Sequence, residues 1–151
     1  MMGPRGEGWV IGQFAIALAI LAATFFTRVE LPMFLQFMGI AMLMVGAIVI
    51  AFATLRLGKN LTPFPKPKEG EHTLVTSGVY GIVRHPIYFG FALAALGWTL
   101  YWGTLLGIAL AMFLFVWFDL KARREEKWLA EKYPEYAAYR ARVKKLIPFV
   151  Y

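Results

Sequence analysis

The chain has 151 residues, of which 60% are hydrophobic, and its formal net charge is +7. Soluble domains average about 45–50% apolar residues, so this composition indicates that much of the surface faces a bilayer. The absence of cysteine excludes disulfides, thiolate metal sites and cysteine nucleophiles. The lysines and arginines lie beside long apolar runs, which favours a membrane surface over nucleic acid as the partner of this charge.

Two charge-free runs near the amino terminus have the length of membrane-spanning helices. They cover residues 9–27 and 33–55, and a short polar turn separates them. A spanning helix needs about 20 apolar residues, whereas the apolar part of a signal peptide has about 7–15, so we expect the first run to be retained as a span. Together the two runs predict a helical hairpin.

Residues 56–85 predict an extended loop outside the membrane. Pro63, Pro65 and Pro67 occupy every second position among charged residues. Proline lacks the donor N–H and its ring clashes with the preceding helical turn, so a helix cannot continue here. Long loops of this kind are often functional.

A further charge-free run, residues 86–118, is too long for one span and shorter than the roughly 40 residues of two full spans. The Tyr-Trp-Gly sequence at 101–103 favours a hairpin turn, because aromatic residues prefer the membrane interface. We therefore expect a helix over 86–102, beginning at a proline. A second helix over 104–120 is expected to continue into the charged segment as one long helix.

The positions of the 16 lysines and arginines predict the orientation, since such residues concentrate on cytoplasmic segments. Most lie in residues 56–84 and 121–145. Four spans would place the amino terminus, the proline-rich loop and the tail 121–151 together on the cytoplasmic side. The predicted fold class is an all-α, multi-pass integral membrane protein with four transmembrane helices in two hairpins. Residues 1–151 form a single domain in this prediction.

The tail is expected to form a second helix over residues 135–146. Tyr136, Tyr139 and Val143 recur there at helical spacing, with arginines and lysines between them. This pattern predicts an amphipathic, basic and aromatic helix that lies on the membrane surface.

Arg84, His85 and Pro86 lie where the loop enters the third expected helix, and two interpretations remain open. In one, the arginine meets lipid headgroups, the histidine caps the helix and the proline takes its first position. In the other, the free N–H groups and positive dipole end of this helix hold an anion. His85 would then complete a polar pocket with Tyr80 and Tyr88.

The Glu125–Glu126 pair is the second candidate. In one interpretation it belongs to a solvated helix face with i,i+4 ion pairs. In the other, the helix returns beside the loop and one glutamate faces a ligand pocket. Lys121 and Glu125 are four residues apart, so a cation and an anion would meet the same cavity. No metal site is expected, because the chain has no cysteine and two histidines without a zinc-ligand spacing.

Both candidates match a known pattern. The sequence Leu74-Val-Thr-Ser-Gly-Val-Tyr80, followed by Arg84-His85-Pro86-x-Tyr88-x-Gly90, resembles the signature of isoprenylcysteine carboxyl methyltransferases. The same signature marks a wider family of integral-membrane methyltransferases that includes phospholipid methyltransferases. The tail, with its glutamate pair and following aromatic residues, is similar too, so the resemblance covers about residues 62–151.

The resemblance implies S-adenosylmethionine as cofactor, bound on the cytoplasmic side without a Rossmann fold. The cofactor-binding residues that it implies are His72, Thr73, Leu74, Val75, Tyr80, His85, Pro86, Tyr88 and Glu125. It also places Lys121 where the family has an arginine that engages the acceptor carboxylate, with Arg124 as a rival for that role. A lysine keeps the charge but loses the bidentate geometry. Glu126 or His85 would be the base for a thiol or amine acceptor.

The expected function is methyl transfer from S-adenosylmethionine to a lipophilic acceptor at the cytoplasmic membrane face, most like carboxyl O-methylation of an isoprenylcysteine-type substrate. A carboxylate is already ionised, so the protein chiefly supplies alignment and excludes water. The alternatives are phospholipid N-methylation or small-thiol S-methylation on the same fold, an NADPH-dependent membrane reductase of related architecture, and a non-enzymatic membrane protein. Expected partners are a lipophilic small molecule or prenylated substrate and membrane lipid, without nucleic acid.

Overall fold

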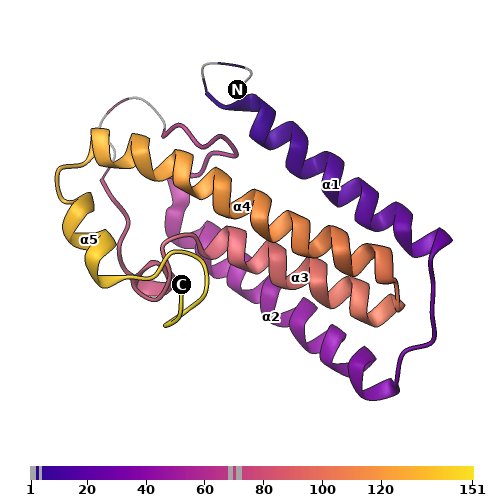
Figure 1. The fold of residues 1–151 in the computed structure, drawn as a ribbon. Helices are drawn as coiled ribbons and strands as arrows, with labels where there is room; N and C mark the ends of the chain where they lie inside the picture. Colours follow the sequence, from indigo (N-terminus) through magenta and orange to yellow (C-terminus); the bar gives the residue numbers. More distant parts are fainter. Residues whose placement is uncertain (1–2, 4, 68–69, 71–72) are drawn as a thin grey trace.

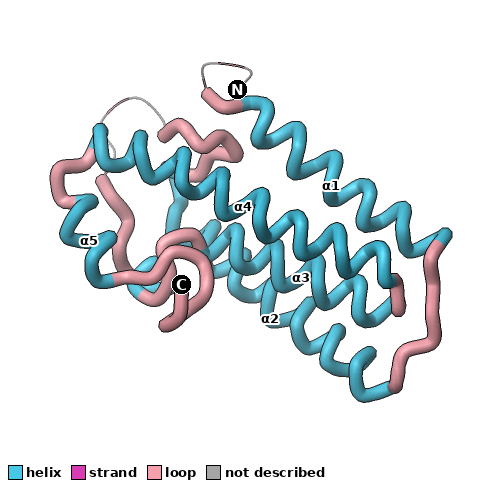
Figure 2. The backbone as a smooth tube through the Cα atoms, viewed as in Figure 1, coloured by secondary structure: helices cyan, strands magenta, loops and turns pink. Residues whose placement is uncertain are grey.

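The computed structural model describes residues 3, 5–67, 70 and 73–151, and all regular elements within them are helical (Figure 2). No β-strand occurs among these residues, which confirms the all-helical expectation. The α-helices are α1 (Glu7–Phe26), α2 (Met33–Leu57), α3 (Pro86–Trp102), α4 (Leu105–Lys132) and α5 (Tyr136–Arg142). Two short 3-10 helices, η1 (Gly58–Asn60) and η2 (Gly78–Gly81), lie in the loop between α2 and α3.

Three helices, α1, α2 and α4, are long and apolar enough to cross a membrane. Their outward faces carry large exposed apolar side chains, as expected for contact with lipid. Helix α3 has 17 residues, fewer than the usual length of a span. The protein is therefore an integral membrane protein built from several apolar helices.

The long helices lie side by side in the order α2, α3, α4, α1 (Figure 1). Helices α1 and α2 are consecutive in the chain, yet α3 and α4 lie between them, so the expected packing of the first two helices as a hairpin is wrong. The reason is the connection 27–32, which is extended rather than tight. Six extended residues reach up to about 20 Å, more than the 8–10 Å between packed helices.

Glycines explain why α2 packs on α3 instead. Gly39 and Gly46 of α2 face Gly97 and Gly90 of α3. A Cβ atom added to Gly39 would lie 2.6 Å from the Gly97 carbonyl oxygen, and one added to Gly46 would lie 2.6 Å from the Gly90 oxygen. The two backbones thus touch without side chains between them, a common solution in membranes, where small residues allow close van der Waals packing.

The α3–α4 turn is fixed by local hydrogen bonds. Gly103 adopts φ +63°, and a Cβ there would lie 2.1 Å from the Val29 carbonyl oxygen, so only glycine fits. Thr104 caps α4 by accepting a hydrogen bond from the Gly107 N–H at 3.0 Å. Its hydroxyl also lies 2.7 Å from that of Thr27, which ties the end of α1 to this turn.

At the opposite end, α4 continues past the apolar region to Lys132, as the sequence predicts, but α5 is shorter than expected. It ends at Arg142 because the following residues run beside the loop that precedes α3. The Arg84 N–H donates to the Lys144 carbonyl at 2.8 Å, and the His85 N–H donates to the Lys145 carbonyl at 3.1 Å. The carbonyl groups of Lys144 and Lys145 therefore bond to the loop, and α5 does not continue through them.

The aromatic face of α5 points inward. Tyr136 and Tyr139 are buried and pack with Tyr133, Leu74 and Val143. The prediction that these tyrosines lie on the membrane surface is wrong, because they cover the loop instead of lipid. The tail thereby closes one end of the bundle (Figure 1).

Candidate functional site

A cavity of about 350 Å³ lies where the four long helices, the proline-rich loop and the tail meet. Its lining includes residues from α1, α2, α3 and α4, from the loop segments on either side of the undescribed residues, and from the tail. The sequence separation of these segments is large, so only the tertiary fold assembles the cavity.

The start of α3 supplies one wall. Pro86 occupies the first helical position and His85 is the N-cap residue, but the His85 side chain makes no capping hydrogen bond. Instead its ring stacks on that of Tyr88, with centroids 5.4 Å apart, and both line the cavity. His85 therefore holds the N-cap position, as the first interpretation expected, but its ring faces the cavity instead of bonding to the helix end.

Helix α4 supplies a carboxylate, Glu125, that faces Tyr88 and His85. The Tyr88 hydroxyl donates to Glu125 Oε2 at 2.5 Å, and His85 Nδ1 lies 3.9 Å from the same oxygen. Glu125 lines the cavity and remains partly exposed. The sequence expectation that one glutamate of the pair faces a pocket thus agrees with the position of Glu125.

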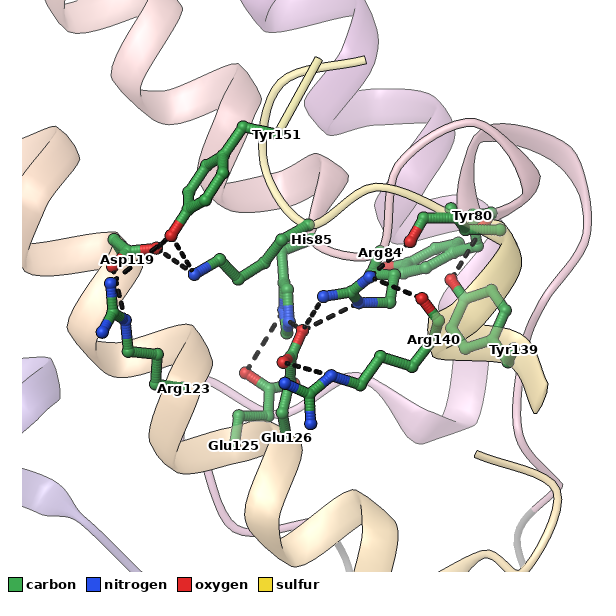
Figure 3. A network of polar contacts seen from close by, with 12 residues as sticks. Tyr80, Arg84, His85, Asp119, Arg123, Glu125, Glu126, Tyr139, Arg140 and Tyr151 are labelled. Carbon is green, nitrogen blue, oxygen red and sulfur yellow. Dashed lines mark hydrogen bonds and ion pairs between the residues drawn. The ribbon is translucent and has the colours of Figure 1, made fainter. Parts of the chain in front are cut away.

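The neighbouring Glu126 points elsewhere (Figure 3). Its Oε1 accepts from Arg84 Nε and Nη2, both at 2.8 Å, and lies 3.1 Å from His85 Nε2. It is buried and does not line the cavity. Glu126 therefore belongs neither to a solvated helix face nor to the cavity wall, so the geometry does not favour the role of base that we expected for it.

Arg84 is held inside the protein rather than at lipid headgroups. Besides Glu126, its guanidinium donates to the carbonyl oxygens of Arg140 and Val143 in the tail (Figure 3). One arginine therefore joins the loop, α4 and the tail. This junction positions His85 and the first turn of α3 against α4.

Lys121 is a buried cation on the cavity wall, with 1% of its surface exposed. Its Nζ donates to Gln13 Oε1 at 2.6 Å and to the Pro63 carbonyl at 3.0 Å. It also lies 4.9 Å from the centre of the Tyr88 ring. Lys121 and Glu125 line the same cavity, as their spacing predicts.

Arg124, the rival of Lys121, does not line this cavity. Its exposed guanidinium lies over the Trp128 ring, 4.5 Å from the centroid. The geometry therefore favours Lys121 over Arg124 as the cation that meets a ligand in the cavity.

Most of the implied cofactor residues of the loop line the cavity. They are Thr73, Leu74, Val75 and Tyr80, together with Pro86 at the helix start. His72 lies outside the described residues. The carbonyl of Tyr80 accepts a hydrogen bond from the Tyr139 hydroxyl at 2.7 Å. Burial raises the pKa of Tyr139, so this hydroxyl stays protonated and remains a donor.

One residue of the cavity wall has a polar group that is available to bond to a cofactor. Among the described residues, the buried Tyr136 hydroxyl has no hydrogen-bond partner in the protein. A buried unpaired hydroxyl costs about 1–3 kcal/mol, which a ligand polar group can offset. With the Glu125 carboxylate available to a cationic group, the donor and acceptor set suits a polar, positively charged cofactor such as S-adenosylmethionine.

Sequence reasoning missed Gln13, Tyr136 and Tyr139 as cavity residues. A signal existed for Gln13, since an amide within an apolar span is costly unless it has a partner. For the two tyrosines the available signal was the family resemblance of the tail's aromatic residues. Helical spacing alone does not tell a face that packs on protein from a face that lies on lipid.

Comparison with known proteins places the chain in a family. The model of the phospholipid methyltransferase family matches residues 34–136. A probable protein-S-isoprenylcysteine O-methyltransferase of Oryza sativa subsp. indica is 28% identical, over 91% of this chain and 74% of that protein. Protein-S-isoprenylcysteine O-methyltransferase B of Arabidopsis thaliana is 31% identical, over 87% of this chain and 68% of that protein.

A solved structure has the same fold. It is that of the eukaryotic intramembrane Ras methyltransferase ICMT (isoprenylcysteine carboxyl methyltransferase), with a TM-score of 0.71 and 24% identity. The match covers 99% of this chain and 55% of that one, so the chain spans about half the length of the solved relative.

Fold and family together define an integral-membrane methyltransferase. The chain belongs to the phospholipid methyltransferase family, whose model matches more than half of it. The resemblance and the enzyme class predicted from the sequence are thereby confirmed, and the expectations of a reductase or a non-enzymatic protein are not supported.

Proposed function

We propose that this protein transfers a methyl group from S-adenosylmethionine to the carboxylate of an isoprenylcysteine-type acceptor at the cytoplasmic membrane face. The main supporting observation is a buried ammonium, Lys121, in a cavity whose other walls include apolar side chains from all four long helices. An acceptor of this class has the matching parts, an anionic carboxylate on a long apolar chain. The relatives named above carry this activity in their names.

Lys121 has the capacity to place such a carboxylate. An ammonium has three N–H donors, and Gln13 and the Pro63 carbonyl use two of them. The third is available to an acceptor oxygen. Because Lys121 is buried, its attraction to a carboxylate is screened less than that of a surface lysine.

The apolar side of the cavity reaches the lipid-facing surface. Phe14 of α1 and Phe91 of α3 both line the cavity, yet they are 64% and 47% exposed. An isoprenyl chain can therefore lie partly in the cavity and partly in the bilayer. This geometry supports entry of the acceptor from the membrane.

The polar side of the cavity is proposed to hold the cofactor. When bound, S-adenosylmethionine supplies an electrophilic methyl group on its sulfonium. Glu125, oriented by the Tyr88 hydroxyl, would pair with a cationic part of the cofactor. The residues proposed to contact it are His72, Thr73, Leu74, Val75, Tyr80, His85, Pro86, Tyr88 and Glu125.

No proton has to be removed from an ionised carboxylate, so this reaction needs alignment more than a base. Lys121 would orient the acceptor, and the closed tail would keep water from the reacting centre. Glu126 would act only as a positioning residue, since it holds Arg84 and His85 against α4.

We further propose that α3 is a fourth span and that residues 1–151 form one domain. Its 17 residues extend about 26 Å, close to the roughly 30 Å hydrocarbon core. It lies between α2 and α4, which are both candidate spans. Four spans put the amino terminus, the proline-rich loop and the tail on the cytoplasmic side, where positive residues concentrate.

The description of the family model raises a second candidate, methylation of a phospholipid amine. An amine acceptor must be deprotonated, and His85 is the residue in the cavity wall best suited to accept that proton. In this candidate the buried Lys121 would pair with the phosphate of the lipid headgroup, so the identity of the acceptor separates the two candidates.

Purified protein in detergent tests both candidates. Titration with S-adenosylhomocysteine by calorimetry should show binding, and absence of binding at millimolar ligand would rule out both. Radiolabelled methyl transfer is then compared between N-acetyl-farnesylcysteine, its carboxamide and phosphatidylethanolamine. Transfer to the free acid alone supports carboxyl methylation. Transfer to phosphatidylethanolamine alone would replace it with the second candidate.

A further inference from the structure

Residues 147–151 form an exposed apolar turn. Phe149 is 82% exposed and Val150 is 71% exposed. In the segment 121–151, all of which is described, the large apolar side chains that are exposed belong to the last three residues. Phe149 and Val150 lie outside every candidate span, so lipid contact along a span does not explain their exposure.

This turn is held in place rather than loose. The Tyr151 carbonyl accepts hydrogen bonds from the N–H groups of Leu146 and Ile147, both at 2.7 Å, and the Tyr151 N–H donates to the Ile147 carbonyl at 3.0 Å. Phe149 adopts φ +64°, in the left-handed region that is unfavourable for a residue with a side chain. The hydrogen bonds of the turn therefore hold Phe149 in an unfavourable backbone conformation with its side chain exposed.

The turn is fastened to α4 at the membrane boundary. The Tyr151 hydroxyl lies 3.1 Å from Asp119 Oδ1 and accepts from Lys145 Nζ at 2.6 Å (Figure 3). Lys145 also forms an ion pair with Asp119. Asp119 is the first charged residue after the apolar run 86–118, so the turn lies at the level where α4 leaves the hydrocarbon.

A basic groove of about 510 Å³ adjoins the turn, and Val150 and Tyr151 line part of it. Its lining includes one carboxylate, Glu126, and six cations, Arg84, Arg123, Arg140, Arg142, Lys144 and Lys145. Arg84 is paired with Glu126, and Arg123 and Lys145 are paired with Asp119. Arg140 also forms an ion pair with Glu126, with 3.8 Å between Nε and Oε2. With the exposed Arg142 and Lys144, the six cations still outnumber the two carboxylates, Glu126 and Asp119, so the groove is positive.

We infer that this surface binds anionic membrane lipids, with Phe149 and Val150 inserted among the headgroups and the groove in contact with lipid phosphates. An apolar tip flanked by cations is the pattern of an interfacial anchor. Each lysine or arginine near an anionic leaflet strengthens such binding about fivefold. The charge of the groove and the level of the tip beside Asp119 both match a lipid surface.

Lipid binding at the turn also affects the position of the tail. Arg84 links the loop, α4 and the tail, and the chain runs on from these contacts into the turn. Lipid binding at the turn therefore holds the tail, which lines part of the cavity, against the membrane surface.

The absence of cysteine allows a direct test. Phe149→Cys is labelled with an environment-sensitive fluorophore, and Ala137→Cys, an exposed position on α5, serves as the matched control. Both are reconstituted in nanodiscs of phosphatidylcholine, with or without phosphatidylserine, that contain a spin-labelled lipid as quencher. Thermal unfolding in detergent checks that each variant is folded.

We expect the label at residue 149 to be quenched at least about twofold more than the label at residue 137. Phosphatidylserine should increase the quenching at 149, and the added substitutions Arg142→Gln and Lys144→Gln should abolish that increase. Equal quenching at the two positions overturns the proposal. The proposal is also overturned if quenching at 149 does not change with phosphatidylserine, or if the two substitutions do not alter that change.

Discussion

Glu125 and Glu126 are adjacent in α4, yet their carboxylates belong to different environments. Glu125 accepts a hydrogen bond from Tyr88 at the cavity wall, whereas Glu126 is buried in an ion pair with Arg84 behind it. Successive side chains on a helix point about 100° apart. Glu125 therefore faces the cavity, whereas Glu126 points into the protein toward Arg84. Their substitutions should therefore have different effects.

Glu125→Gln should weaken binding of S-adenosylhomocysteine about tenfold or more, because a charged hydrogen bond of about 1.5–3 kcal/mol is lost. Calorimetry measures the affinity, and the melting temperature should change little, since Glu125 is partly exposed. Glu131→Gln, at an exposed position of α4, is the matched control. Equal affinity in the two variants would place the cationic part of the cofactor elsewhere.

Glu126→Ala should instead destabilise the protein. Loss of one partner of a buried ion pair costs about 3–5 kcal/mol, because Arg84 would remain buried without its carboxylate. The expected result is a clear drop in melting temperature in detergent. The double variant Arg84→Met with Glu126→Leu should recover part of the loss, and no recovery would argue against this ion pair as the cause.

Lys121→Met should keep cofactor affinity and lower turnover of a carboxylate acceptor at least about 100-fold, in line with the loss of a charged group that orients the substrate. Lys121→Arg keeps the charge and should retain more activity. Initial rates with N-acetyl-farnesylcysteine distinguish the variants. If Lys121→Met turns over as fast as the wild type, another group must hold the acceptor carboxylate.

Tyr136→Phe removes the buried hydroxyl that lacks a protein partner. Stability should stay the same or rise, since an unsatisfied polar atom disappears. If the cofactor bonds to this hydroxyl, its affinity should fall up to about tenfold. Tyr139→Phe is the contrasting control, because it breaks the bond to the Tyr80 carbonyl and should lower the melting temperature.

Gly46→Leu should disrupt the α2–α3 contact. A Cβ at this position already meets the Gly90 carbonyl oxygen at 2.6 Å, so a larger side chain forces the helices apart. A marked loss of thermal stability is expected. Ala41→Leu, on an exposed position of the same helix, should be tolerated because it adds apolar surface facing lipid.

Much of the site followed from local patterns. The proline alternation placed the loop outside the helices, and the i,i+4 spacing brought Lys121 and Glu125 to one cavity wall. Those inferences succeed because covalent geometry and helix periodicity act over a few residues, whatever surrounds them.

The sequence by itself determined an all-helical membrane protein with a charged tail, because apolar runs and prolines act locally. Only the tertiary structure decided that α1 lies on α4, that Glu126 faces Arg84, and that Tyr136 and Tyr139 cover the loop instead of lipid. Lipid and protein interior are both apolar, so a hydrophobic face does not specify its neighbour. That choice depends on contacts between distant residues, such as the glycines of α2 and α3 and the hydrogen bonds from Arg84 to the tail.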